Sequence, residues 1–125
     1  MTFNLYVAWI SFLCGALAGA TTGLFFRDED WLGGYADWRR RMVRLGHIAF
    51  FGIGLLNAVF AFSAAHLGLT TGLEIPAYLL FVGAVTMPTL CYLSAIRDGF
   101  RHLFFIPAGA VTAAILIFLW RLVSS

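Results

Sequence analysis

Two histidines, His47 and His102, occupy equivalent positions in two apolar stretches of the chain. In each stretch a glycine (Gly54 or Gly109) follows seven residues after the histidine, and an alanine follows eleven residues after it. Over the twelve residues from histidine to alanine, the two stretches are identical at four positions. Imidazole is a common metal ligand, so the repeated histidine is the first candidate for chemistry in this sequence.

Helical geometry predicts what these histidines could hold. At about 100° per residue, each glycine lies within about 40° of its histidine, so each imidazole shares a face with small residues. Two such faces opposed across a bundle could hold a metal ion, or a haem iron at both axial positions. The glycines would leave room for the macrocycle, and an arginine near each histidine would bind a propionate. The predicted cofactor-binding residues are His47, His102, Gly54, Gly109, Arg44 and Arg101, with the two histidines as metal ligands.

Haem b is the favoured cofactor, and copper or zinc is the alternative. A protein without any cofactor is the other possibility, because a histidine in the first turn of a membrane helix is often an interfacial residue. His66 lies off the face of His47 and is interpreted as interfacial. The arrangement of histidines on four apolar segments resembles that of small membrane b-type cytochromes in general layout.

The composition predicts a protein that resides in the lipid bilayer. Hydrophobic residues make up 62% of the chain and charged residues 11%, whereas soluble domains have roughly a quarter charged residues. The net charge of +2 is small and lies at the ends of apolar segments, which argues against nucleic-acid binding. The cysteines Cys14 and Cys91 lie within apolar runs and are interpreted as buried structural thiols.

The hydropathy pattern predicts one all-α membrane domain over residues 1–125, a four-helix up-down bundle. The first apolar segment is too long for a signal peptide and has no basic residue before it, so we expect it to span the membrane. The expected spans are residues 3–26, 45–66, 75–96 and 103–120. In such a bundle the second and fourth spans are diagonal and face each other across the core.

Residues 27–44 form the one substantial polar segment. Aromatic residues and a methionine recur there at helical spacing, which is typical of a helix lying in the membrane interface. A solvated connecting loop is the alternative. The residues at this spacing are Trp31, Tyr35, Trp38 and Met42.

The arginines predict the orientation. Seven of the eight lie on one side of the predicted spans, and the eighth, Arg121, lies on the other. The positive-inside rule then places both termini outside and the arginine-rich loops in the cytoplasm, which suits a bacterial inner membrane. The seven are Arg27, Arg39, Arg40, Arg41, Arg44, Arg97 and Arg101.

Two further features concern helix packing. Small residues recur every fourth position in the first span, which is typical of a face that another helix approaches closely. We expect this face to mediate homo-oligomerisation or binding to a larger membrane complex. Asn57 lies mid-membrane, where its amide is expected to bond to a neighbouring helix. The small residues are Ser11, Gly15, Gly19 and Gly23.

Two functions remain after the exclusions. No carboxylate lies inside a predicted span, which disfavours ion-coupled transport, and no set of catalytic residues is recognisable, so no enzyme activity is assigned. The first hypothesis is an electron-transfer protein with haem or metal between the second and fourth spans. The second is a cofactor-free accessory or assembly subunit of a larger membrane complex.

Overall fold

The computed structural model describes residues 2–124, and these residues form four long helices with short connections. All four are long and apolar enough to cross a membrane, which confirms the all-α membrane-spanning fold class. Within residues 2–124 there is no strand. The helices are α1 (Thr2–Phe25), α2 (Trp38–His66), α3 (Glu74–Ile96) and α4 (Phe105–Val123), and short 3-10 helices lie at η1 (Trp31–Gly33) and η2 (Asp98–Leu103).

The helix boundaries differ from the predicted spans at the arginine-rich end. α2 begins at Trp38 instead of residue 45, because Asp37 caps its first turn by accepting a hydrogen bond from the Arg39 N–H. The aromatic residues of segment 27–44 therefore do not share one interfacial helix. Residues 27–37 form a connection around η1, and residues 38–44 form the first turns of α2.

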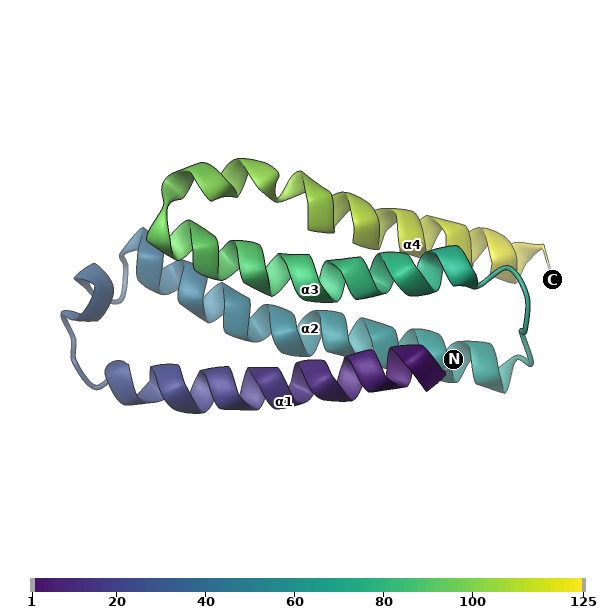
Figure 1. Ribbon diagram of the computed structural model, residues 1–125, viewed down its shortest axis with the longest axis horizontal. Coiled ribbons are helices and arrows are strands. Elements are labelled where there is room, and N and C mark those ends of the chain that lie inside the picture. The colour runs from purple at the N-terminus through teal and green to yellow at the C-terminus, as the bar shows by residue number, and fades with distance from the viewer. Residues whose placement is uncertain (1, 125) are drawn as a thin grey trace.

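The four helices lie side by side in chain order, with α1 and α4 at opposite edges (Figure 1). α2 and α3 form the centre, α1 packs mainly on α2, and α4 packs mainly on α3. α4 meets α2 around Phe60, whose ring centroid lies 4.9 Å from that of Phe118. The packing thus differs from a closed bundle in which the second and fourth helices face each other along their length.

Two apolar clusters stabilise the opposite ends of this arrangement. The cluster at the end away from the arginine-rich loops joins α2, α3 and α4. The cluster at the arginine-rich end joins α2 and α3, and side chains from both connecting segments pack against it. The first contains Phe60, Ala64, Leu73, Ala77, Leu80 and Ala114, and the second contains Met42, Val43 and Ala95.

The small-residue face of α1 lies mostly against α2 within the same chain. A Cβ atom added at Gly15 would lie 2.7 Å from the ring of Phe51, and one added at Gly19 would collide with the ring of His47. An added Cβ at Gly23 would have no neighbour within 4 Å. Self-association through this face stays a prediction, and the contacts of Gly15 and Gly19 within the chain reduce the surface available for it.

Candidate functional site

His47 packs into the interface between α1 and α2. Its ring is half-buried, lies against Gly19 of α1, and meets the Phe51 ring edge-on at a centroid distance of 5.4 Å. Its Nδ1 atom is buried and has no hydrogen-bond partner within the described residues 2–124. The imidazole therefore faces α1. α1 and α4 lie at opposite edges of the molecule (Figure 1).

His102 lies in a different environment. It belongs to η2, which precedes α4 and packs against α3, and its side chain is exposed. The predicted symmetry between His47 and His102 is thus present in the sequence spacing but absent from the packing. The two histidines lie on different packing surfaces.

The two predicted glycines differ in the same way. An added Cβ at Gly54 would lie 2.8 Å from the Phe12 ring and 3.1 Å from the Cβ of Ser11, so α1 fills the space beside it. An added Cβ at Gly109 would meet nothing within 4 Å. Gly54 therefore faces α1 and Gly109 faces open space, and neither glycine lines the groove between α2 and α4.

The two predicted arginines also differ in their contacts. The Arg44 guanidinium donates a 3.0 Å hydrogen bond to the carbonyl oxygen of Tyr35 and lies 3.9 Å from the centroid of its ring. The Arg101 side chain is exposed and has no hydrogen bond to any residue that the structure describes. The Arg44 side chain thus stabilises the connection between α1 and α2 through its contacts with Tyr35.

These contacts test whether the predicted residues fit a haem or metal held inside one chain. His47 faces α1, His102 is exposed on η2, and α1 covers Gly54. Across residues 2–124 there is no group of three or more histidine, cysteine or acidic side chains placed to hold a metal ion. The six residues do not line one cavity, so they do not fit a bis-histidine group between α2 and α4 of a single chain.

A pair of buried asparagines joins the three helices α1, α2 and α3. The Asn4 Nδ2 atom donates to the Oδ1 atom of Asn57 at 2.8 Å and to the Ala77 carbonyl of α3 at 3.1 Å. Asn57 in turn donates to the carbonyls of Ile53 and Leu80. Both asparagine side chains are fully buried, where an amide needs partners because no water is available. The predicted interhelical role of Asn57 is confirmed, while Asn4, a polar residue in an apolar segment, was not singled out from the sequence.

Arg40 stabilises the connection between α1 and α2. Its side chain is 4% exposed, and its guanidinium donates to the carbonyl oxygens of Phe26, Asp28 and Glu29 at 3.0–3.3 Å. The guanidinium also lies 4.4 Å from the centroid of the Phe26 ring. Carbonyls at the end of a helix have no intrahelical donors. A cation there donates hydrogen bonds to them and interacts favourably with the negative end of the helix dipole. In the sequence, Arg40 was recognisable only as one of the seven arginines that predict the orientation in the membrane.

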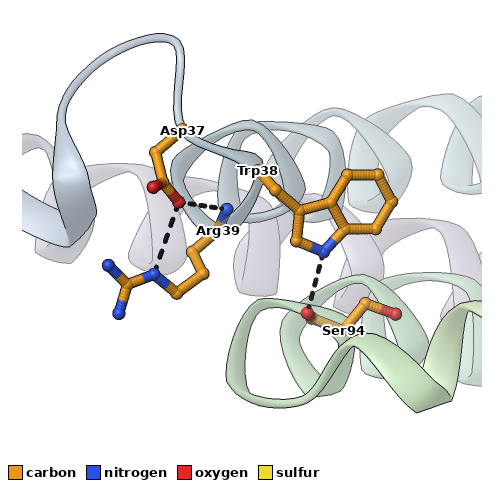
Figure 2. A network of polar contacts seen from close by, with 4 residues as sticks. All are labelled: Asp37, Trp38, Arg39 and Ser94. Carbon is orange, nitrogen blue, oxygen red and sulfur yellow. Dashed lines mark hydrogen bonds and ion pairs between the residues drawn. The ribbon is translucent and has the colours of Figure 1, made fainter.

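Trp38 attaches the start of α2 to the end of α3 (Figure 2). Its Nε1–H donates a 3.1 Å hydrogen bond to the carbonyl oxygen of Ser94. On the opposite side of the first turn, the Asp37 carboxylate accepts from the Arg39 N–H and forms an ion pair with its guanidinium at 3.3 Å. These contacts fix the arginine-rich end of α2.

Grooves on the surface of residues 2–124 include three that neither His47 nor His102 lines. No protein family model, curated protein or solved structure matches this chain. The first groove lies between α2 and α4, the second lies between α1 and α3, and the third is lined by Arg97, Gly99, Phe100 and Leu103.

Proposed function

We propose that the protein is a cofactor-free subunit of a larger membrane assembly, which it joins through α4. The observation that carries this proposal is the uncovered face of α4. In the fourth apolar segment, Asp98–Val123, 17% of the most apolar stretch is buried inside the chain, against 22% in α1 and 44% in α2 and α3. Lipid alone could cover such a face, so a protein partner is favoured only if the face carries residues suited to helix contact.

The uncovered face of α4 carries residues suited to contact with another helix. Gly109 has open space beside it, and Thr112, three residues further on, is exposed. The hydroxyls of Thr22, Thr86 and Thr89 bond to carbonyls of their own helices. The hydroxyl of Thr112 has no partner among residues 2–124, and neither do those of Thr2 and Thr21 in α1. A small residue beside an unpartnered hydroxyl favours close approach of a second helix that supplies the hydrogen bond.

In-membrane photo-crosslinking tests this proposal. A photoreactive residue at Thr112 should give a discrete product whose mass identifies the partner, and the same residue at Gly52 on α2 should give none. Gly52 is the matched control because it is also exposed with no neighbour within 4 Å. Gly109→Leu should abolish the product by keeping the partner helix away, and Gly52→Leu should not affect it. Equal products from the two positions, or none from Thr112, would refute the docking role of α4.

The second candidate is a b-type haem or metal-binding electron-transfer protein, and one observation favours it. The Nδ1 atom of His47 is buried and has no hydrogen-bond partner among residues 2–124, which is a costly arrangement for a polar atom. An optical spectrum and metal analysis of the purified protein would test this candidate. A reduced α-band that His47→Ala or His102→Ala abolishes would establish a haem, while a colourless, metal-free protein expressed with ample haem would exclude one.

We further infer that the arginine-rich end faces the cytoplasm of a bacterial inner membrane, with both termini outside. The support is the distribution of arginines, seven on one side and one on the other. Cysteines placed at Tyr35 and Leu69, in a chain without Cys14 and Cys91, should label from the cytoplasm and from outside, respectively. Labelling of Leu69 from the cytoplasm would reverse the orientation.

A further inference from the structure

We infer that the groove at η2 binds the phosphate group of an anionic phospholipid. The groove has a volume of about 330 Å³ and lies where α3 ends and η2 begins. Arg97, Phe100 and Leu103 line it, so a residue with a cationic side chain lies beside two residues with apolar side chains. A cation beside an apolar wall matches a phospholipid, which joins a phosphate to hydrocarbon chains.

The two arginines of this segment have no internal partner among residues 2–124, a property that they share with the exposed Arg27 and Arg41. Four arginines bond to a carbonyl or a carboxylate of the same protein. The side chains of Arg97 and Arg101 are exposed and form neither a hydrogen bond nor an ion pair within residues 2–124. Their donors are available to an external anion. The four partnered arginines are Arg39, Arg40, Arg44 and Arg121.

The position of the groove favours a lipid over a soluble anion. η2 joins two helices that are long and apolar enough to span the membrane, so the groove lies near the headgroup layer. Ile96 and Phe105, which flank the segment, are 76% and 69% exposed, and they extend the apolar surface toward the hydrocarbon. Asp98 is the one carboxylate in Arg97–Arg101; it is exposed and does not line the groove, so the segment keeps a net positive charge.

The predicted orientation would place this groove in the cytoplasmic leaflet, where anionic lipids are found. A guanidinium can donate two parallel hydrogen bonds to a phosphate, whereas an ammonium acts as a point charge. We therefore expect Arg97 to contribute both its positive charge and paired hydrogen bonds to the phosphate. This inference is independent of the docking role proposed for α4, since Gly109 and Thr112 do not line the groove.

The test is native mass spectrometry of the full chain with phosphatidylglycerol or phosphatidylcholine of the same acyl composition. The protein should retain phosphatidylglycerol preferentially, and Arg97→Gln should weaken its binding roughly fivefold, the effect of about one surface arginine. Arg97→Lys should restore part of the loss. Arg41→Gln is the matched control, because Arg41 is also exposed and without a side-chain hydrogen bond among the described residues, but lies in the first turn of α2.

Each outcome decides the inference. Equal retention of the two lipids, or equal losses in Arg97→Gln and Arg41→Gln, would overturn it. Inorganic phosphate at the same concentration should displace little phosphatidylglycerol, and complete displacement would identify a soluble anion as the ligand. Helical circular dichroism of each variant shows whether it folds, and Arg97→Lys keeps the comparison valid if Arg97→Gln does not fold.

Discussion

The stretches His47–Ala58 and His102–Ala113 share one sequence pattern but differ in their surroundings. The first lies inside the long helix α2 and packs on α1, so Gly54 is covered and Asn57 is fully bonded. The second begins in η2 and continues into α4 at the edge of the molecule, where Gly109 has open space beside it. The difference shows that residue spacing defines a helix face, while the neighbouring helix decides whether that face forms a core, a site or a free surface.

The largest difference between the two stretches should appear at their glycines. Gly54→Leu would force a side chain into the ring of Phe12, and overpacking of this kind costs about 1–3 kcal/mol. Gly109→Leu should leave the free energy of unfolding of the isolated chain unchanged, because nothing lies within 4 Å. Unfolding of the two variants in the same detergent measures this contrast. Equal destabilisation would show that α4 is covered in the isolated protein.

The polar residues at aligned positions, Asn57 and Thr112, should give the next largest difference. Asn57→Leu removes the bond from Asn4 and the bond to the Leu80 carbonyl, and interhelical hydrogen bonds of this kind contribute roughly 0.6–1.7 kcal/mol. Thr112→Val should not change the stability of the isolated chain, since its hydroxyl has no partner within residues 2–124. The same unfolding measurement applies, and destabilisation by Thr112→Val would contradict the assignment of its hydroxyl to a partner protein.

The spans and the role of Asn57 could be predicted from the sequence, because both depend on local properties. A run of about 20 apolar residues forms a membrane helix in almost any context, and an amide at its centre needs a partner. The separation of His47 from His102 could not be predicted, because it depends on which helices are neighbours. The packing that turns His47 toward Gly19 is set by contacts over the whole length of α1 and α2.

Arg40 shows a different limit of prediction from sequence. The positive charge of Arg40 predicted a position on the cytoplasmic side. Nothing in the sequence predicted that Arg40, alone among the eight arginines, has a buried side chain. The carbonyls it binds belong to residues 11–14 positions earlier, and they come within reach because the chain turns at η1. The positive φ values of Leu32, Gly33 and Gly34 produce that turn. Glycine pairs predict such turns in general, but not which side chain the turn brings to the carbonyls.

Substitutions at the two histidines should differ in their effect on the free energy of unfolding by a smaller amount, and in the opposite direction. His47→Phe keeps a ring against Gly19 and removes the buried Nδ1 atom that has no partner among the described residues, so we expect stabilisation of about 1 kcal/mol. His102→Phe adds no packing on an exposed segment and should leave the free energy of unfolding unchanged. Strong destabilisation by His47→Phe would show that Nδ1 has a bound partner in the purified protein, which would favour the cofactor hypothesis.

The smallest expected effect comes from capping at the N-termini of α2 and α4, the helices that contain the two stretches. Asp37 caps α2 by accepting from the Arg39 N–H, whereas no side chain caps α4 at Phe104. The backbone hydrogen bond from Arg39, together with its guanidinium, lowers the pKa of Asp37 below the ordinary 3.8. A lowered carboxyl pKa means that the capping contribution is fully present above pH 3.8 and is lost as the pH falls through the lowered pKa.

Amide exchange at Arg39, corrected for the rate in a free chain, measures this cap. Protection should fall as the solution is acidified in the wild type, because the protonated carboxyl is a weaker acceptor for the N–H. Asp37→Asn should retain the cap and abolish the pH dependence, since the asparagine amide oxygen also accepts from the backbone and does not titrate in this range. Asp37→Ala should lower protection at every pH. If Asp37→Ala exchanged like the wild type at neutral pH, Trp38 and its bond to Ser94 would be sufficient to hold the first turn of α2, and the cap would contribute nothing.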